Sequence, residues 1–374
     1  MSTELKQQWP DLAARGFGGS VVYANDELFA ERENLIKPGD PVFQPHTFGH
    51  KGQIMDGWET RRRREPGHDH AIVRLGGGGV IRRVVVDTSF FTGNYPPEVS
   101  VEACGAEGYP GPGELAAAEW ITLVPQTPVQ GDARNEFTVS VEQRFTHVRL
   151  TIYPDGGVAR LRVFGEPVPD PRLLPGVIDL AALENGALVT DSSNSFYNSA
   201  TNLIMPGLAR VMGDGWETSR RRDHGHDWVT VQLACAGTVE VAELDTSCFV
   251  GNAPGWASLR GDGGDGGDLL PRTALQPDTR HRFAVVGAPV AEQARLDVYP
   301  DGGMARLRVY GAPIPAAREA LASRFLHLLP RPQLTAILTA AGVPPTEAAG
   351  RAATGAGLAD LPPSLRAAFR LAPR

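Results

Sequence analysis

Cysteine is scarce in this sequence. Its 374 residues include only Cys104, Cys235 and Cys248. Two of these fall in the second copy of an internal repeat, where the first copy has Gly77 and Phe90, so neither belongs to a site that both copies share. The scarcity argues against a disulfide framework, a zinc site and a cysteine nucleophile.

Basic charge and long apolar runs are also missing. The formal net charge of −7 is opposite to the basic excess typical of nucleic-acid-binding proteins, so we expect no nucleic-acid partner. The first ten residues, MSTELKQQWP, contain no apolar core of a signal peptide, and no apolar run reaches the length of a membrane span. We therefore expect a soluble, cytoplasmic protein with no membrane partner.

Glycine and proline, by contrast, are abundant. The chain has 43 glycines and 31 prolines, about a fifth of all residues, which predicts many turns between short strands. Its length favours two domains, each large enough to bury a core.

One charged stretch occurs twice. Residues 56–69 read DGWETRRRREPGHD, and residues 214–227 read DGWETSRRRDHGHD. Over the 21 positions that start at Asp56 and Asp214, 13 are identical. Two further phrases recur in the same order, residues 87–96 as 245–254 and residues 153–165 as 299–311. The chain is therefore an internal duplication.

Alternating apolar and polar residues predict half-buried strands in both copies. In residues 147–153, for example, Val148, Leu150 and Ile152 fall on one face. Residues 71–75 and 80–86 are predicted as two short strands around a turn at Gly76–Gly79. That glycine run lacks the strand and helix context of a dinucleotide-binding loop.

The pattern predicts an all-β protein made of two tandem jelly-roll β-sandwich domains of galactose-binding-like type, followed by a short helical tail. The tail is expected to contain helices at 316–329, 333–341 and 361–371. The predicted boundaries are an N-terminal segment 1–16, repeat 1 at 17–165, a linker at 166–185, repeat 2 at 186–311 and a helical C-terminal extension at 312–374.

The repeated stretch contains groups suited to polar chemistry. The planar forks of Arg62, Arg63 and Arg64 suit carboxylates and flat, amide-like groups. His68 could transfer protons near neutral pH, while Asp69 or Glu59 could orient it or activate water. The alternative is a structural network around Trp58, because residues 56–69 balance four acids against four arginines. The residues alone leave both readings open.

A loop upstream of Asp56 is about ten residues longer in the first copy, and it contains His46, His50 and Lys51. The triplet His68–His70 could suggest a metal, but the second copy has Trp228 in place of His70, so we expect no metal and no cofactor.

The repeated phrases resemble those of the allantoicase family. They are residues 55–64, residues 67–69, the DT-x-x-F-x-GN phrase of residues 87–94, and YPDGG-x-ARLRV. The resemblance covers about residues 17–313, and its departures are Ser219 in place of Arg61, Trp228 in place of His70, and the tail. It implies two tandem jelly rolls and a hydrolase of allantoin (purine) catabolism that cleaves allantoate to ureidoglycolate and urea.

The implied substrate carries one carboxylate and two flat ureido groups, which suits arginine forks. We expect catalysis by Glu59, His68 and Asp69. Substrate binding is expected from His50, Lys51, Arg61, Arg62, Arg63, Arg64, Glu217, Arg220, Arg221, Arg222 and His226.

Two questions stay open at this point, the function and the number of copies that build the site. The rival function is a non-catalytic tandem jelly roll that binds carbohydrate or another small ligand. A site centred on the first copy is expected, against one composite site built from both copies. A homo-oligomer is also expected.

Overall fold

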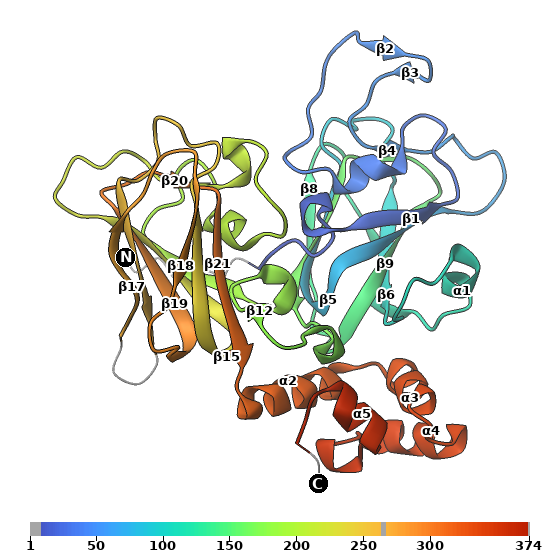
Figure 1. The fold of residues 1–374 in the computed structure, drawn as a ribbon. Coiled ribbons are helices and arrows are strands. Elements are labelled where there is room, and N and C mark those ends of the chain that lie inside the picture. Colours follow the sequence, from blue (N-terminus) through green and yellow to red (C-terminus); the bar gives the residue numbers. More distant parts are fainter. Residues whose placement is uncertain (1–8, 263–266, 373–374) are drawn as a thin grey trace, which may run out of the picture. The chain divides into compact units, whose positions relative to one another are not determined.

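The structure is a computed structural model that describes residues 9–262 and 267–372. It contains two compact units, which are described separately (Figure 1). The first-repeat unit comprises Trp9–Val168 and Phe325–Pro362. The second-repeat unit comprises residues 169–324 and the chain from Pro363 onward. Both units are built mainly from antiparallel strands, and the prediction of an all-β repeat fold is confirmed.

The first-repeat unit contains a seven-stranded sheet in the order β1-β5-β9-β6-β7, with β8 and β11 paired to β5. The strands are β1 (Ser20–Ala24), β5 (Asp69–Asp87), β6 (Glu98–Cys104), β7 (Ile121–Pro128), β8 (Arg134–Thr138), β9 (Arg144–Tyr153) and β11 (Arg160–Pro167). The first part of β5 pairs with β1 and β9, and its last part pairs with β8 and β11. This long strand therefore joins the two layers of a sandwich.

The second-repeat unit has the same plan. Its sheet runs β12-β21-β15-β19-β16-β17, and β13 and β18 pair with β15. The strands are β12 (Ile178–Asp179), β13 (Leu188–Ser192), β15 (Asp227–Asp245), β16 (Trp256–Gly261), β17 (Asp268–Ala274), β18 (Arg280–Ala284), β19 (Val290–Tyr299) and β21 (Arg306–Pro313). The strand that follows the charged stretch is 19 residues long in both units.

The prediction of a turn at Gly76–Gly79 is wrong, because these glycines lie inside β5. A Cβ atom on Gly76 or Gly79 would come 2.4 Å from the carbonyl oxygen of Phe17 or Glu166. The glycines therefore allow neighbouring backbone to approach the strand closely. The register with β9 also shifts between Arg74 and Gly79, so the strand bends there and does not reverse.

Two tryptophans anchor the charged stretches in the cores. Trp58 and Trp216 are fully buried. They lie on short strands, β4 (Trp58–Glu59) and β14 (Trp216–Glu217), which pair with β10 (Gly157–Val158) and β20 (Gly303–Met304). Each indole N–H donates to a backbone carbonyl, Asp26 O at 2.8 Å and Asn194 O at 2.7 Å. Burial of both rings fixes where each arginine run leaves its sandwich.

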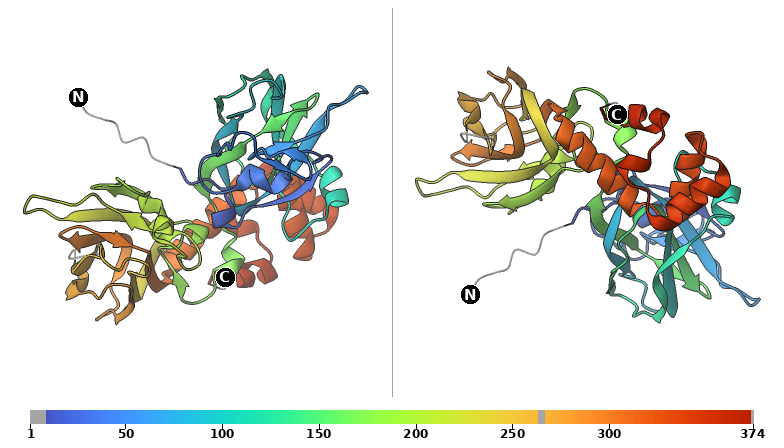
Figure 2. Two further views of the ribbon diagram at one scale, coloured as in Figure 1. Left: turned by 90° about the horizontal axis from the view of Figure 1, so that it is seen from above. Right: turned by 90° about the horizontal axis from the view of Figure 1, so that it is seen from below.

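The longer loop of the first copy carries a small hairpin, β2 (Phe48–Gly49) and β3 (Gly52–Gln53), which extends away from its sandwich in Figures 1 and 2. The 3-10 helices are η1 (Arg15–Phe17), η2 (Arg32–Ile36), η3 (Pro171–Leu173), η4 (Leu183–Asn185), η5 (Ala200–Ile204), η6 (Met212–Asp214) and η7 (Leu358–Asp360).

The tail is helical, as predicted. After α1 (Pro112–Ala116) in the first repeat come α2 (Pro315–Leu328), α3 (Arg331–Ala340), α4 (Pro345–Thr354) and α5 (Pro363–Ala368). The sequence reading missed α4, which begins with proline at its first position and is rich in alanine.

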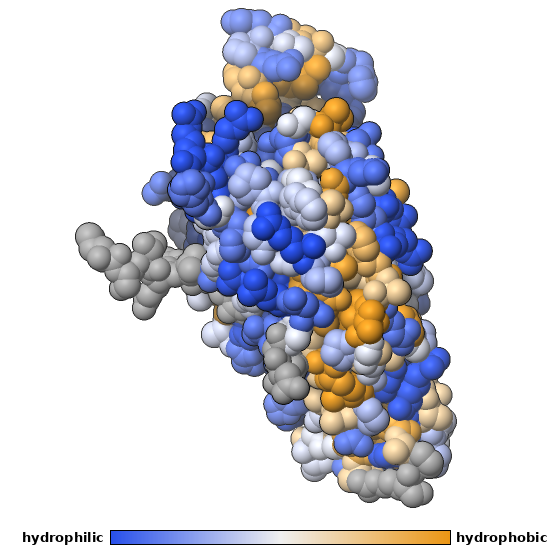
Figure 3. Space-filling model, turned by 60° about the vertical axis from the view of Figure 1, so that its left-hand side comes forward, coloured by the Kyte–Doolittle hydropathy of each residue, from blue (hydrophilic) through white to orange (hydrophobic). Residues whose placement is uncertain are grey.

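The surface mixes hydrophobic with polar side chains. On the face drawn in Figure 3, hydrophobic residues lie among hydrophilic ones. Among the residues that the structure describes, no helix is long and apolar enough to cross a membrane.

Candidate active site

The arginine run of the first copy, residues 61–64, lies between β4 and β5. The Tyr-Pro-Asp-Gly-Gly turn, residues 153–157, holds it through hydrogen bonds. Thr60 N donates to Gly156 O at 3.1 Å, and Gly156 N donates to Thr60 Oγ1 at 3.2 Å. Arg63 N donates to Asp155 Oδ2 at 2.8 Å. The carboxylate of this turn residue therefore positions the arginine run.

Arg63 and Asp69 form the central ion pair of this site. Arg63 Nη1 lies 2.5 Å from Asp69 Oδ1, and Asn25 Nδ2 donates to the same oxygen at 2.9 Å. Asp69 is the first residue of β5 and is 1% exposed. Two atoms of the pair are buried without a hydrogen-bond partner in the described part of the chain, Arg63 Nε and Asp69 Oδ2. The pair thus retains one unused donor and one unused acceptor.

A second ion pair fixes the start of the run. Arg61 Nε lies 2.5 Å from Asp26 Oδ2, and the backbone N–H groups of Arg61 and Leu28 donate to Asp26 Oδ1 at 2.9 and 3.0 Å. Although partial burial works in the opposite direction, these hydrogen bonds and the Arg61 guanidinium hold the pKa of Asp26 below its usual value. Asp26 therefore serves as a permanent anion that orients Arg61.

These groups line a pocket of about 360 Å³. Its lining residues are Asn25, Asp26, Arg61, Arg62, Arg63, Arg64, Glu65 and Asp69. The structure thus brings together five of the predicted site residues, the four arginines and Asp69. Asn25 and Asp26 were missed by the sequence reading, because the second copy has Ser193 and Asn194 at the equivalent positions.

Glu59 and His68 are near the run in sequence but do not line this pocket. Glu59 is half-buried, accepts a hydrogen bond from Asn94 Nδ2 at 2.7 Å, and has its pKa raised by burial. His68 is exposed, with its ring 5.4 Å from that of Tyr153. Asn94 was also missed, although it lies in the repeated DT-x-x-F-x-GN phrase.

The long loop carries two predicted substrate-binding residues, His50 and Lys51, and Lys51 contacts the segment that follows Asp26. Lys51 Nζ is 3.0 Å from Glu31 Oε1 and donates to Glu27 O at 3.1 Å, while His50 is exposed. Lys51 therefore ties the long loop to the segment that carries Asp26. Among the described residues, no group of three or more histidine, cysteine or acidic side chains is arranged to hold a metal ion.

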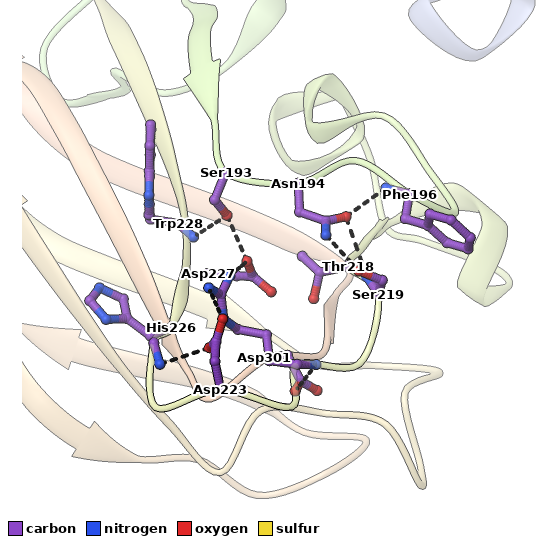
Figure 4. Close-up of polar contacts among 12 residues, drawn as sticks. Ser193, Asn194, Phe196, Thr218, Ser219, Asp223, His226, Asp227, Trp228 and Asp301 are labelled. Atoms are coloured by element: carbon purple, nitrogen blue, oxygen red, sulfur yellow. Dashed lines mark hydrogen bonds and ion pairs between the residues drawn. The ribbon is translucent and has the colours of Figure 1, made fainter.

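The second copy has the same ion pair, and Asp227 Oδ2 is also without a partner among the described residues, but the arginine differs (Figure 4). Arg221 Nη1 lies 2.7 Å from Asp227 Oδ1, as in the first copy. Asp223, however, accepts from Arg221 Nε at 3.0 Å and from Arg221 Nη2 at 3.1 Å. The donor that Arg63 leaves unused is therefore occupied in the second copy.

Other second-copy contacts are neutral or structural. The Asp26–Arg61 pair is replaced by Asn194 and Ser219, whose side chains hydrogen bond at 2.6 Å (Figure 4). Glu217 accepts from Asn252 at 2.6 Å. The two remaining predicted arginines of this copy, Arg220 and Arg222, are exposed.

His226 is also held differently from His68. Its Nε2 lies 2.9 Å from Asp297 Oδ1, and Asp297 is fully buried. The equivalent position in the first copy is Thr151, which has no carboxylate. The second-copy histidine is therefore anchored to a buried carboxylate, an anchor that the first-copy histidine lacks.

Known proteins resemble this chain in sequence and in structure. A family model described as the allantoicase repeat matches residues 10–168 and 178–314. The chain belongs to the allantoicase family. A probable allantoicase from Nocardia farcinica is 60% identical over 309 residues, which cover 81% of this chain and 94% of that protein. One from Streptomyces coelicolor is 52% identical over 338 residues, 86% of this chain and 90% of that protein.

A solved structure supports the same relationship. The crystal structure of allantoicase from Saccharomyces cerevisiae is 34% identical, covers 82% of this chain and 94% of that chain, and has a TM-score of 0.72. The resemblance predicted from the repeated phrases is confirmed, and a non-catalytic binding protein is not favoured.

Proposed function

We propose that this chain hydrolyses allantoate to ureidoglycolate and urea, and that it does so in the pocket around Arg63 and Asp69. Membership of the allantoicase family supports the reaction. The placement in the first copy rests on the pocket of about 360 Å³ and on its four arginines.

The unused atoms of the Arg63–Asp69 pair are the observation that carries this placement. Arg63 Nε is a donor without a partner, and Asp69 Oδ2 is an acceptor without one, within the described residues. A buried polar group without a partner costs about 1–3 kcal/mol, so a ligand that satisfies both atoms gains that energy. A ureido group offers a carbonyl oxygen and an N–H on one edge, which is the complement of this pair.

The other end of the substrate is a carboxylate. Arg62 and Arg64 are exposed, and neither has an ion-pair partner among the residues described. Guanidinium groups bind carboxylates with two parallel hydrogen bonds. We therefore assign these two arginines to the substrate carboxylate and Arg63 to a ureido group.

The reaction replaces one ureido group on the central carbon by hydroxyl. As the bond from that carbon to the departing nitrogen breaks, the remaining ureido nitrogen loses its proton to Asp69, and the departing nitrogen gains one. Water then adds to the resulting C=N bond, with its hydroxyl going to carbon and its proton to nitrogen. The proton held by Asp69 passes back to the group that protonated urea. Glu59, with a pKa raised by burial, and His68 are the proposed sources of the proton for urea. Neither lines the pocket, so we propose that the proton reaches the departing nitrogen through a water molecule.

The deciding experiment is urea release from allantoate by the purified protein and matched variants. We expect Arg63→Lys and Asp69→Asn to lower kcat by about a hundredfold or more, because both remove groups that act on the reacting atoms. Arg221→Lys and Asp227→Asn change the equivalent second-copy pair and should retain activity. Wild-type protein that releases no urea would overturn the proposed function.

A cytoplasmic location and a homo-oligomeric state, expected from the sequence, belong to the same proposal. Cell fractionation tests the location, and light scattering of the purified chain tests the oligomeric state.

A further inference from the structure

The first repeat contains a second pocket, of about 460 Å³, under its long loop. Its lining includes Lys37, Val42, Gln44, Ile54, Asp56 and Arg160. It shares no lining residue with the Arg63–Asp69 pocket. Nothing in the proposed reaction uses it.

A buried arginine lines this pocket with one donor unused. The side chain of Arg160 is 2% exposed, its Nη2 lies 2.6 Å from Asp56 Oδ2, and its Nη1 donates to Asp56 O at 2.8 Å. Its Nε is buried and has no hydrogen-bond partner in the described part of the chain. A buried guanidinium N–H without an acceptor is costly, so the pocket lacks one acceptor.

The second repeat shows what normally fills that position. Arg306, the counterpart of Arg160, donates from Nε to Gly207 O at 2.9 Å, and Arg308 Nη2 donates to the same carbonyl at 2.9 Å. In the first repeat the equivalent Gly39 carbonyl accepts from Arg162 Nη2 at 2.6 Å, and Arg160 does not reach it. The copy with the longer loop thus leaves its buried arginine without this backbone acceptor.

The acidic groups of the pocket already have partners, so they do not supply the missing acceptor. Glu31 pairs with Lys51, and Asp40 pairs with Arg134. Asp56 accepts from both Arg160 and Lys37, with Lys37 Nζ 3.1 Å from Asp56 Oδ1. These contacts keep the pKa of Asp56 below its usual value even though partial burial opposes them.

We propose that this pocket binds a small carboxylate, separate from the substrate bound at Arg63 and Asp69. The ligand oxygen accepts from Arg160 Nε and from Lys37 Nζ, whose side chain is half exposed. Apolar side chains at Val42 and Ile54 line the pocket beside these two cations. The second repeat has Met205 in place of Lys37, and its loop is about ten residues shorter. It therefore lacks both the cation and the loop of this pocket.

Binding of glycolate, a two-carbon carboxylate without a ureido group, tests this proposal by titration calorimetry. Methylurea, which has a ureido group and no carboxylate, serves as the second probe. Lys37→Met introduces the second-copy residue, and a further variant replaces residues 37–55 by residues 205–213, the short loop of the second copy. Circular dichroism and thermal unfolding establish that both variants fold.

We expect glycolate to bind the wild-type chain, about tenfold more weakly to Lys37→Met, and not to the short-loop variant. The double variant Arg62→Ala with Arg64→Ala removes the groups assigned to the substrate carboxylate. It should bind glycolate as the wild-type does, and methylurea should not compete with glycolate. No glycolate binding to the wild-type chain, or equal binding to both loop variants, would overturn the proposal. So would loss of glycolate binding in the double arginine variant, because the carboxylate would then occupy the catalytic pocket.

Discussion

The carboxylate of Asp155 accepts a hydrogen bond from the backbone N–H of Arg63 at 2.8 Å. The second copy has the same contact, in which Arg221 N donates to Asp301 Oδ2 at 2.8 Å. Each Tyr-Pro-Asp-Gly-Gly turn therefore holds the centre of its arginine run, although the two contacting residues are 92 positions apart in the first copy and 80 in the second.

The first prediction uses this symmetry. Asp155→Ala should weaken the orientation of Arg63, lower kcat/KM for allantoate and reduce the free energy of unfolding by about 1–2 kcal/mol. Asp301→Ala should cost similar stability and leave kcat/KM unchanged, because Arg221 lies outside the proposed site. Steady-state kinetics and denaturant unfolding of both variants check this. Equal kinetic losses in the two would contradict a site in the first copy alone.

Much of this arrangement was predictable from the duplication. The repeated phrases located the arginine run, Asp69 and the tryptophan that both copies share, because segments that recur in the same order mark structure common to the two copies. The polarity of the stretch pointed to arginine forks, and the structure places all four first-copy arginines around one pocket.

What was missed depends on contacts across the chain. Asn25 and Asp26 differ between the copies, so the duplication gave no sign that they contact Asp69 and Arg61. An aspartate before two glycines is typical of turns, so nothing in the sequence indicated that Asp155 also contacts Arg63. Gly76–Gly79 was predicted as a turn because glycine runs commonly separate strands, whereas the close approach of Phe17 is a tertiary requirement.

A second prediction concerns Asp223, the carboxylate that binds the second-copy arginine Arg221. Asp223 occupies Arg221 Nε at 3.0 Å, and the first copy has Glu65 and Pro66 where the second has Asp223 and His224. The double change Glu65→Asp with Pro66→His should let the new carboxylate bind Arg63 Nε. We expect kcat/KM for allantoate to fall about tenfold or more, since the ureido group loses its donor.

Glu65→Ala is the matched control for that double change. It removes the longer carboxylate without supplying a shorter one, and should retain most activity. Urea-release kinetics compare the three proteins, and full activity in the double variant would show that Arg63 Nε is not used by the substrate.

A third prediction follows from His147, which is 1% exposed in the first repeat. Burial, reinforced by the charge of Arg74, lowers the pKa of His147 to about 4 from 6.5. As pH falls below 6.5, the unfolded chain takes up this proton before the folded chain does. Stability is therefore lost between pH 6.5 and about 4, by on the order of 3 kcal/mol.

Thermal unfolding across that pH range measures the loss. His147→Asn keeps a polar atom near Thr146 Oγ1, which contacts His147 Nδ1 at 2.9 Å, but does not titrate. Its Tm should fall less steeply than that of the wild-type chain from pH 6.5 to 4. Parallel curves for the two proteins would show that His147 is not responsible.

A fourth prediction concerns the tail, of which Phe325–Pro362 belong to the first-repeat unit. Leu328 clusters with Val80 and Val168, and Gln333 Nε2 lies 2.5 Å from Glu107 Oε1. A chain that ends at Pro315 exposes this apolar cluster, so its Tm should fall by several degrees. The residues of the proposed site are retained, and kcat measured on the folded fraction should stay within about twofold of the full chain. A folded but inactive truncation would assign the tail a part in the chemistry.

The last prediction separates a first-copy site from a composite one. His226 Nε2 lies 2.9 Å from the buried Asp297, which Arg295 and Arg260 also contact, at 3.0 and 3.6 Å. His226→Ala removes one of these partners and should lower Tm modestly. His68 is exposed, so His68→Ala should leave Tm nearly unchanged. If His68 donates the proton to the departing urea, its removal lowers kcat by about a hundredfold, whereas His226→Ala leaves the folded protein active. Equal losses of kcat in the two variants, at unchanged Tm, would instead require that both copies contribute to one site.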